Sequence, residues 1–344
     1  VKKFKELNTF TIGFKDPSQN EANVAQKISE HLKTKHFEMY CDEEKAIQLA
    51  SKLYDFYDEP FGDSSAIPTI LVSEFAKERV SVSLSADGGD EFFMGYTRYL
   101  LVKKIFDNKL INNYVVKKLL HLIYPVTGFI EKKFGFYNLK TRVLKILQIL
   151  NSKNHYQAIQ NILKIIPDAE LNNILTDEIL SIESVQKECN TKLKDGRLWD
   201  AQNYLPDDIL TKVDRATMSC SLEGREPFLD HKIIEFATTL PKDYLHKNGR
   251  GKFIIRDITH EFIPVELIDL PKKGFSVPLK NWLLGPLKEF VDKAIENCSE
   301  DFFPELDVVN ISKLHKDFYI NPESSNPHKI WLIVNYINWK LRWG

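Results

Sequence analysis

Residues 84–96 read Leu84-Ser-Ala-Asp-Gly-Gly-Asp-Glu-Phe-Phe-Met-Gly-Tyr96. The segment follows a short run at 80–84 whose alternating β-branched residues predict a strand. Asp87 and Asp90 flank two glycines that would let the backbone approach a phosphate closely. Carboxylate oxygens at the carboxyl end of a parallel strand suit Mg²⁺ bound to phosphate. A plain Asp-Gly-Gly turn without chemistry is the alternative interpretation.

The first hundred residues alternate between strand and helix patterns. We predict strands at 8–14, 36–40 and 80–84, and helices at 20–32, 46–57 and 65–79. Strands that are separated by helices pair in parallel through right-handed crossovers. The pattern therefore predicts an α/β fold class with one parallel sheet, whose carboxyl edge carries the loop after residue 84.

Beyond Tyr99 the strand pattern fades and helical periodicity takes over, interrupted by prolines. No internal repeat or low-complexity linker divides the chain. We therefore expect a single domain over residues 1–344, in which an α/β layer at residues 1–100 packs on a mainly helical part at residues 101–344.

The overall composition is that of an ordinary globular protein. Of 344 residues 43% are hydrophobic, and 47 Lys and Arg nearly balance 48 Asp and Glu. This balance argues against a dedicated nucleic-acid binder, which carries a strong basic excess. The cysteines lie far apart without a Cys-x-x-Cys pair, so neither a zinc site nor a disulfide framework is expected. Because no signal-peptide pattern or long apolar stretch is found, we expect a cytoplasmic protein without a membrane partner.

The even balance hides a basic block at residues 97–166. Eleven Lys and two Arg face only Asp107 and Glu131 there, which gives the block a net charge of +11 and leaves −12 for the rest. The lysines alternate with apolar residues at helical spacing, as in solvated amphipathic helices. A docking surface for an anionic partner is the alternative.

Several segments, taken in order, resemble one enzyme family. Residues 84–99 resemble the L-S-G-D-G-G-D-E-L-F-G-G-Y-x-R-Y signature of glutamine-hydrolysing asparagine synthetases. Residues 9–14 are similar to the family's nucleotide-contacting strand, and residues 272–282 to its K-K-G-F-x-V-P-L-x-x-W segment. Residues 204–218, continuing through 222–230, are similar to its long helical signature. The resemblance covers nearly the whole chain and implies a PP-loop-type α/β layer, like that of the adenine nucleotide alpha hydrolases.

The resemblance implies a defined reaction. MgATP would activate the side-chain carboxylate of aspartate, pyrophosphate would leave, and β-aspartyl-AMP would form. Ammonia from a glutaminase domain would then attack the acyl carbon to give asparagine and AMP. Positioning and charge neutralisation at the α-phosphate carry such chemistry. The expected cofactors are ATP and Mg²⁺ and the other partners are small molecules, whereas the oligomeric state stays open.

Two other functions fit the same sequence. The first keeps the adenylation chemistry but amidates another carboxylate, on a sugar or a peptide, as relatives of the family do. The second is a catalytically dead scaffold that docks through the basic block at 97–166. Because the acyl pocket leaves no clear sequence pattern, the motifs do not separate these alternatives from aspartate amidation.

The family motifs assign roles residue by residue. Lys252 lies in residues 251–256, which resemble the G-K-x-x-x-R segment, and would offset negative charge in both transition states. Asp87 corresponds to the acid that helps to form or use the intermediate, and Asp90 to a ligand of Mg²⁺-pyrophosphate. The residues that would line the adenosine are Ile12, Ser85 and Ala86.

Two further pairs of residues have two interpretations each. Lys272 and Lys273 could hold pyrophosphate, or they could form a solvated basic turn. Asp63 and Ser64 precede a predicted helix that points at the same edge of the sheet. They could bind the substrate, or they could serve only to cap that helix.

Two elements of the family pattern are missing. Residue 1 is Val1 instead of the nucleophilic cysteine of the glutaminase domain, so we expect no glutamine hydrolysis by this chain. The S-G-G-x-D-S pyrophosphate loop does not occur before Thr9, which implies an α/β layer that is incomplete at its N-terminus. We therefore expect a fragment of a longer synthetase domain that is inactive in isolation. Ala86 and Met94 also replace glycines of the signature.

Overall fold

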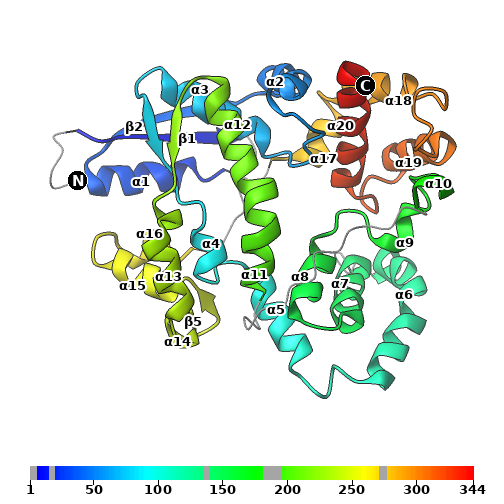
Figure 1. The fold of residues 1–344 in the computed structure, drawn as a ribbon, viewed down its shortest axis with the longest axis horizontal. Coiled ribbons are helices and arrows are strands. Elements are labelled where there is room, and N and C mark those ends of the chain that lie inside the picture. Colours follow the sequence, from blue (N-terminus) through cyan, green and yellow to red (C-terminus); the bar gives the residue numbers. More distant parts are fainter. Residues whose placement is uncertain (1–5, 15–19, 135–138, 181–195, 271–276) are drawn as a thin grey trace.

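The computed structural model describes residues 6–14, 20–134, 139–180, 196–270 and 277–344 (Figure 1). Its α/β part contains β1 (Asn8–Phe14), α1 (Ala22–Leu32), β2 (Lys35–Cys41), α2 (Glu43–Phe56), α3 (Ala66–Lys77) and β3 (Val82–Leu84). All six elements occur where the sequence predicts them, within a few residues. The third strand is shorter than expected, because it begins at Val82 instead of residue 80.

The strands of the α/β part form two small parallel sheets. β1 pairs with β2 along its whole length, from Asn8 opposite Lys35 to Phe14 opposite Cys41. β3 pairs instead with β4 (Glu223–Arg225), a strand that was not predicted. Parallel pairing is thus confirmed, but the expectation of one sheet for all three predicted strands is wrong for the described residues. The physical reason is that the backbone N–H and C=O groups of β3 form their hydrogen bonds with β4, a segment that lies far away in the sequence.

The rest of the described chain is mostly helical. Between β3 and β4 lie α4 (Gly89–Phe92), α5 (Thr97–Phe106), α6 (Tyr114–Phe134), α7 (Leu139–Asn151), α8 (His155–Leu163), α9 (Asp168–Leu171), α10 (Asp177–Leu180), α11 (Arg197–Trp199), the π-helix η1 (Asp200–Leu210) and α12 (Thr211–Ser219). After β4 follow η2 (Pro227–Leu229), α13 (His231–Thr239), α14 (Lys242–Leu245), β5 (His246–Lys247), β6 (Arg250–Gly251), α15 (Phe253–His260), α16 (Val265–Ile268), α17 (Leu279–Leu284), α18 (Lys288–Glu296), α19 (Val308–Ile320) and α20 (Pro327–Trp343).

Capping side chains explain where several helices begin. Asp42 accepts a 2.9 Å hydrogen bond from the Lys45 amide at the start of α2. Asn154 plays the same part for α8, and Asn326 does so for α20, whose first residue is Pro327. These residues satisfy N–H groups that have no partner within the helix, and proline suits the first helical position.

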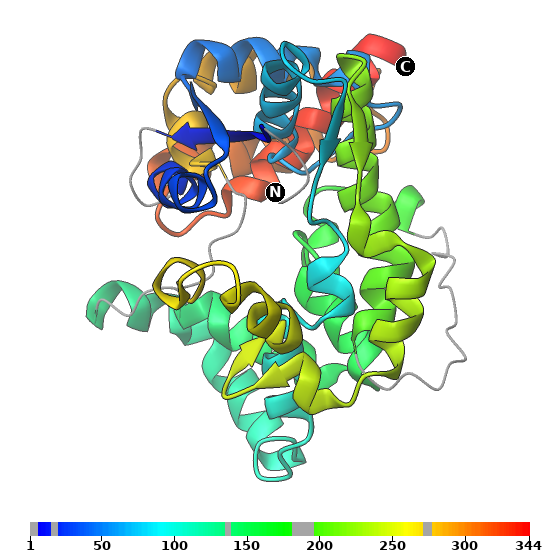
Figure 2. The same cartoon turned by 90° about the vertical axis from the view of Figure 1, so that its left-hand side faces the viewer.

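Two clusters of buried apolar side chains hold the elements together. The first cluster joins the α/β part to the C-terminal helices and contains Leu53, Phe318 and Trp331. The second cluster contains Tyr99 and Ile159 among the helices that follow β3. Figure 2 shows the corresponding upper and lower parts of the molecule, with the chain after β3 running from one to the other. None of the helices in the described residues is long and apolar enough to cross a membrane.

Candidate active site

The candidate site lies where β3 and β4 end side by side. Because the two strands are parallel, their carboxyl ends share one edge, and the Ser85 amide extends the pairing with a 3.0 Å hydrogen bond to the Arg225 carbonyl. The Ser85 hydroxyl also donates a 2.7 Å hydrogen bond to Asp87. Burial and then the negative charge of Asp87 raise the pKa of Glu226, which follows β4. Two acids thus interact at this edge, and Glu226 was not singled out from the sequence.

The loop after β3 turns back sharply at its two glycines. The Gly89 amide donates a 3.2 Å hydrogen bond to the Ala86 carbonyl. Gly88 has a φ of 86°, and a side chain at this position would overlap Leu229. The Gly89 amide is therefore already used to close the turn. In this structure the pair of glycines serves the turn itself and its close packing on η2.

Asp90 and Lys252 form an ion pair in which Nζ and Oδ2 are 3.0 Å apart. Asp90 belongs to α4, whereas Lys252 directly follows the antiparallel hairpin of β5 and β6. The Lys252 amide donates a 2.9 Å hydrogen bond to the Phe93 carbonyl, which fixes the hairpin to the loop. The two side chains are 26% and 27% exposed, so both remain accessible. Two residues that the motifs singled out in distant segments thus lie in direct contact.

Two glycines make this contact sterically possible. At Gly95 a Cβ would overlap both the Asp90 carboxylate and the Lys252 side chain. At Gly251 it would overlap the Met94 carbonyl oxygen, a backbone atom that cannot simply turn aside. Because both glycines border the ion pair, the hairpin can approach the loop only without side chains at these positions.

Buried polar pairs support the loop from the side of the helical part. The Tyr96 hydroxyl donates a 2.5 Å hydrogen bond to Glu91, which is only 2% exposed. Arg98 lies 2.9 Å from the fully buried Asp200 and over the ring of Tyr96, and the Tyr99 hydroxyl donates to the same aspartate. The signature at residues 84–99 contains Tyr96, Arg98 and Tyr99, but no role was predicted for these three residues from the sequence.

Asp63 is engaged by neighbouring protein groups. Its Oδ2 accepts 2.7 Å hydrogen bonds from the Ser65 hydroxyl and from the Lys212 ammonium group, and its Oδ1 accepts the Ser65 amide at 2.9 Å. Ser64 is 4% exposed. These contacts organise the start of α3, whereas a contact of Asp63 or Ser64 with a substrate stays a prediction.

A second acid, Asp208, lies close to Asp63. It was not predicted as a site residue from the sequence. Burial and then the charge of Asp63 raise the pKa of Asp208 to about 7, although Lys212 acts in the opposite direction. Both acids line a hollow of about 460 Å³ that Tyr204 and His328 also border. Asp208 belongs to the long helical signature, so its place in that motif was the only available signal.

Ile12, which was predicted to line the adenosine, belongs to a different strand. Ile12 is 6% exposed, packs in the first core cluster and lies opposite Met39 in the sheet of β1 and β2. In the described residues no strand pairing connects it to the loop that contains Ser85 and Ala86. Lys272 and Lys273 fall outside the described residues.

The donor groups fit a phosphate-bound Mg²⁺ better than a site made by protein alone. Among the described residues no group of three or more His, Cys, Asp or Glu could hold a metal ion. Protein sites for Mg²⁺ on nucleotides often supply one or two carboxylates, and phosphate oxygens and waters complete the shell. Asp87 and Asp90, on one turn, meet that smaller requirement.

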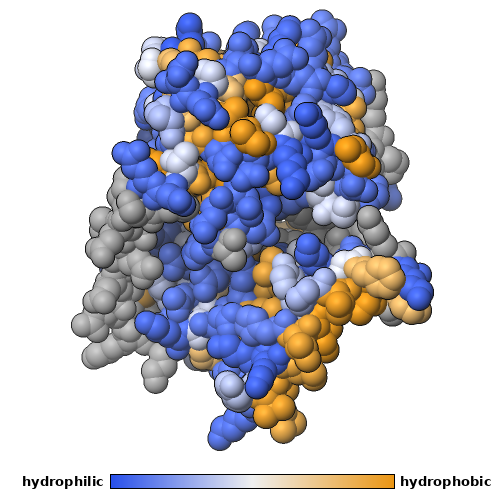
Figure 3. All heavy atoms as spheres, turned by 90° about the vertical axis from the view of Figure 1, so that its right-hand side faces the viewer, coloured by the Kyte–Doolittle hydropathy of each residue, from blue (hydrophilic) through white to orange (hydrophobic). Residues whose placement is uncertain are grey.

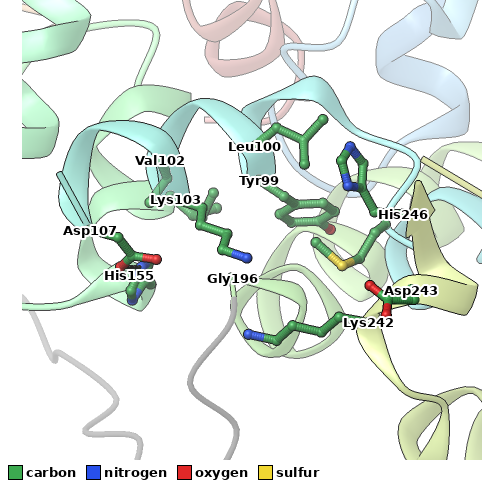
Figure 4. Close-up of a pocket in the computed structure, with 12 residues that line it drawn as sticks. Tyr99, Leu100, Val102, Lys103, Asp107, His155, Gly196, Lys242, Asp243 and His246 are labelled. Carbon is green, nitrogen blue, oxygen red and sulfur yellow. Dashed lines mark ion pairs between the residues drawn. The ribbon is translucent and has the colours of Figure 1, made fainter. Parts of the chain in front are cut away.

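A cavity of about 350 Å³ lies beside the same loop but contains no predicted site residue (Figure 4). Met94 and Tyr99 form part of its wall. Figure 4 shows Lys103 of α5 and Lys242 of α14 extending toward it from two sides. No sequence motif marks Lys103 or Lys242, so their approach to one cavity could be found only in the folded chain.

Comparison with known proteins agrees with the arrangement of these motifs. The asparagine synthase family model matches residues 1–339. The glutamine-hydrolysing asparagine synthetase 1 of Bacillus subtilis is 26% identical, over 97% of this chain and 52% of that protein. A provisionally named asparagine synthetase of Mycobacterium tuberculosis is 25% identical, over 97% of this chain and 50% of that protein. Another, from Methanocaldococcus jannaschii, is 32% identical, over 62% of this chain and 40% of that protein. The chain spans about half the length of the first two relatives. It belongs to the asparagine synthase family.

Proposed function

We propose that this chain is the synthetase part of an ATP-dependent amidotransferase that converts aspartate to asparagine through β-aspartyl-AMP. The observation that carries the proposal is the 3.0 Å contact between Asp90 and Lys252 at the edge where β3 and β4 end. The contact joins an acid suited to Mg²⁺ with a cation suited to a phosphate or acyl oxygen. The names of the relatives support aspartate as the acid that is amidated.

The roles of the loop residues follow from their chemistry. Lys252 offsets the negative charge that develops on the α-phosphate during adenylation and on the acyl oxygen during attack by ammonia. Asp90 would hold Mg²⁺, which would neutralise the pyrophosphate leaving group, and Asp87 would help to form or use the aspartyl-AMP intermediate. Ser85 keeps the Asp87 carboxylate oriented through their 2.7 Å hydrogen bond. Gly95 leaves the space that Lys252 needs.

The proposal assigns the remaining residues to substrate binding. Ile12 lines the adenosine together with Ser85 and Ala86, and Lys272 and Lys273 hold pyrophosphate. Asp63 and Ser64 border the substrate side of the site. Ammonia comes from a glutaminase domain. Because residues 1–344 contain no S-G-G-x-D-S loop, we expect these residues alone to support little or no asparagine formation.

The test is ATP–pyrophosphate exchange, measured both on residues 1–344 and on any longer product of the same gene. Exchange that depends on aspartate is expected for a protein that contains the pyrophosphate loop. Exchange that occurs only with a sugar or peptide carboxylate would replace aspartate as the substrate. Absence of exchange with every acid in a longer product that contains the pyrophosphate loop would overturn the enzymatic proposal and favour a scaffold.

A matched pair of variants tests the loop itself. Asp90→Asn removes the proposed Mg²⁺ ligand and should abolish exchange. Asp58→Asn is the control, because Asp58 is exposed and pairs with Arg215 on the surface. Unchanged exchange in the Asp90 variant would show that the metal assignment is wrong.

A further inference from the structure

Lys252 has a left-handed backbone conformation, which is unusual for a residue that carries a side chain. Its φ is 55° and its ψ is 35°, and it separates β6 from α15. Such a conformation costs energy and persists only where the surrounding structure enforces it. The same turn directs the Lys252 side chain toward Asp90. The groups that enforce the turn therefore also control where the ammonium group lies.

The hairpin of β5 and β6 enforces the turn from the N-terminal side. Asn248 and Gly249 connect its strands with φ values of 52° and 78°, and two positive φ angles in an Asn-Gly pair are typical of a tight two-residue hairpin turn. Gly251, the last residue of β6, lies opposite His246 of β5. Because such a turn fixes the register of the strands, the residue before Lys252 has a defined place.

Arg256 enforces the turn from the side of α15. Its amide donates a 2.9 Å hydrogen bond to the Lys252 carbonyl, and its Nε donates to the Gly251 carbonyl at 3.2 Å. Arg256 thus holds the carbonyl groups of two successive residues at the turn. The planar guanidinium group has further N–H donors, and these can hold a carboxylate at the same time.

Asp269 supplies that carboxylate. Its Oδ1 accepts a 2.9 Å hydrogen bond from Nη1 of Arg256, and its Oδ2 pairs with Arg250 of β6. His260, the last residue of α15, lies 3.3 Å from Oδ1. Burial would raise the pKa of Asp269, but the two arginines hold it below its ordinary value. One charged carboxylate thus joins the strand before Lys252 to the helix after it.

We propose that Asp269 is a positioning residue for Lys252. By binding Arg250 and Arg256 together, it keeps the two segments that enclose Lys252 from moving apart. The proposal rests on the function proposed above for Lys252, because the position of the ammonium group matters for the rate only if it meets the phosphate or acyl oxygen. Asp269 acts through the two arginines, so its removal should slow the chemical step and leave the binding of ATP and aspartate nearly unchanged.

The first test is ATP–pyrophosphate exchange in a longer product that contains the pyrophosphate loop. Asp269→Asn keeps the size of the side chain but removes its charge. We expect kcat to fall about 10-fold or more, whereas KM for ATP and for aspartate should change less than about twofold. Asp269→Glu restores the charge and should recover most of the rate. An unchanged kcat in Asp269→Asn, or a change in KM alone, would overturn the proposal.

Asp292→Asn is the matched control. Asp292 likewise pairs with a long cationic side chain, Lys288, and with a histidine, His315, and its side chain is 28% exposed. It belongs to α18, on the side of the molecule away from α15 (Figure 1). Figure 3 shows that side, where the surface of the upper part is mostly hydrophilic. Because exposed ion pairs contribute little to stability, both variants should unfold at similar temperatures, but only Asp269→Asn should lose exchange activity.

The second test does not depend on activity. The Lys252 amide donates a 2.9 Å hydrogen bond to the Phe93 carbonyl, and hydrogen–deuterium exchange of residues 1–344 reports how often this bond opens. Asp269→Asn should speed deuteration of this amide about tenfold or more relative to Asp292→Asn. Equal protection in the two variants would overturn the positioning role. Lost protection in a protein that exchanges pyrophosphate with no acid would confirm the positioning of Lys252 and show that the proposed reaction is wrong.

Discussion

Lys212 donates a 2.7 Å hydrogen bond to Asp63, although 149 positions separate them in the sequence. The lysine is 8% exposed in α12, and the aspartate directly precedes α3. Burial alone would raise the pKa of Asp63, but Lys212 and Ser65 together hold it below its ordinary value. The ion pair therefore fastens a helix of the second half to the α/β part.

Replacing Lys212 by methionine should strongly destabilise the protein. The variant keeps most of the side-chain volume but leaves the Asp63 carboxylate without its cation. Breaking a fully buried pair costs about 3–5 kcal/mol, and because the Asp63 side chain is 24% exposed the loss should lie at or below the lower end of that range. The free energy of unfolding in urea measures this loss. Lys293→Met is the control, because Lys293 forms only an exposed pair with Glu289. The double variant Asp63→Asn/Lys212→Met should regain part of the stability, and a full additive loss would contradict the coupling.

The titration of Asp208 should make stability fall as the pH rises. Burial and then Asp63 raise the pKa of Asp208 to about 7, whereas the unfolded value is about 3.9. Between these two pKa values the folded state binds more protons than the unfolded state. The contribution of Asp208 to the free energy of unfolding is therefore complete below about pH 4, declines as the pH rises, and is lost once the pH passes about 7. Asp208→Asn removes the effect. The variant should gain roughly 1–3 kcal/mol relative to the unmodified protein between pH 5 and pH 8.

Urea unfolding at several pH values measures this difference directly. Other groups, such as Asp200 with a pKa raised to about 6 by burial, titrate in both proteins and largely cancel in the comparison. A constant difference between the two proteins across this pH range would show that Asp208 does not titrate there.

Alanine at Gly251 should separate Lys252 from the loop. The new Cβ would overlap the Met94 carbonyl oxygen, so the hairpin has to move away from Asp90. Overpacking of this kind costs about 1–3 kcal/mol. Gly128→Ala is the matched control, because its Cβ would make only an ordinary contact with Lys140. Thermal unfolding should show the loss for Gly251→Ala alone, and exchange activity should fall with it.

The sequence predicted those features that short-range patterns encode. The alternation at residues 8–14 corresponds to β1, and Asp42 caps α2 close to the predicted helix start. The contact between Asp90 and Lys252 could be anticipated only because both residues lie in motifs that resemble one family. Composition and periodicity alone would have left Lys252 as one lysine among many.

Features that depend on distant pairing could not be predicted in the same way. The segment Glu223–Arg225 has three residues without apolar alternation, and it is a strand only because β3 lies beside it. The contact between Lys212 and Asp63 likewise requires that α12 pack on α3. The charges of these residues gave no sign of their burial, because lysine and aspartate usually remain at the surface.

The last prediction concerns the hydroxyl group of Tyr96. Tyr96→Phe removes the 2.5 Å hydrogen bond to Glu91, a carboxylate that is only 2% exposed. Loss of a donor to a buried charged acceptor costs about 1–3 kcal/mol, and urea unfolding measures it. Burial and then Glu91 raise the pKa of Tyr96, so the hydroxyl stays protonated and able to donate at neutral pH.

The control for Tyr96 is Tyr244→Phe, because Tyr244 is 51% exposed. Glu91 directly follows Asp90 in α4, so a loosened Glu91 should also disturb the position of Asp90. We therefore expect Tyr96→Phe to lower exchange activity even at temperatures where the variant remains folded. Equal stability and activity in the two variants would mean that the Tyr96 hydroxyl supports neither the fold nor the loop, and that Arg98 over its ring is the contact that matters.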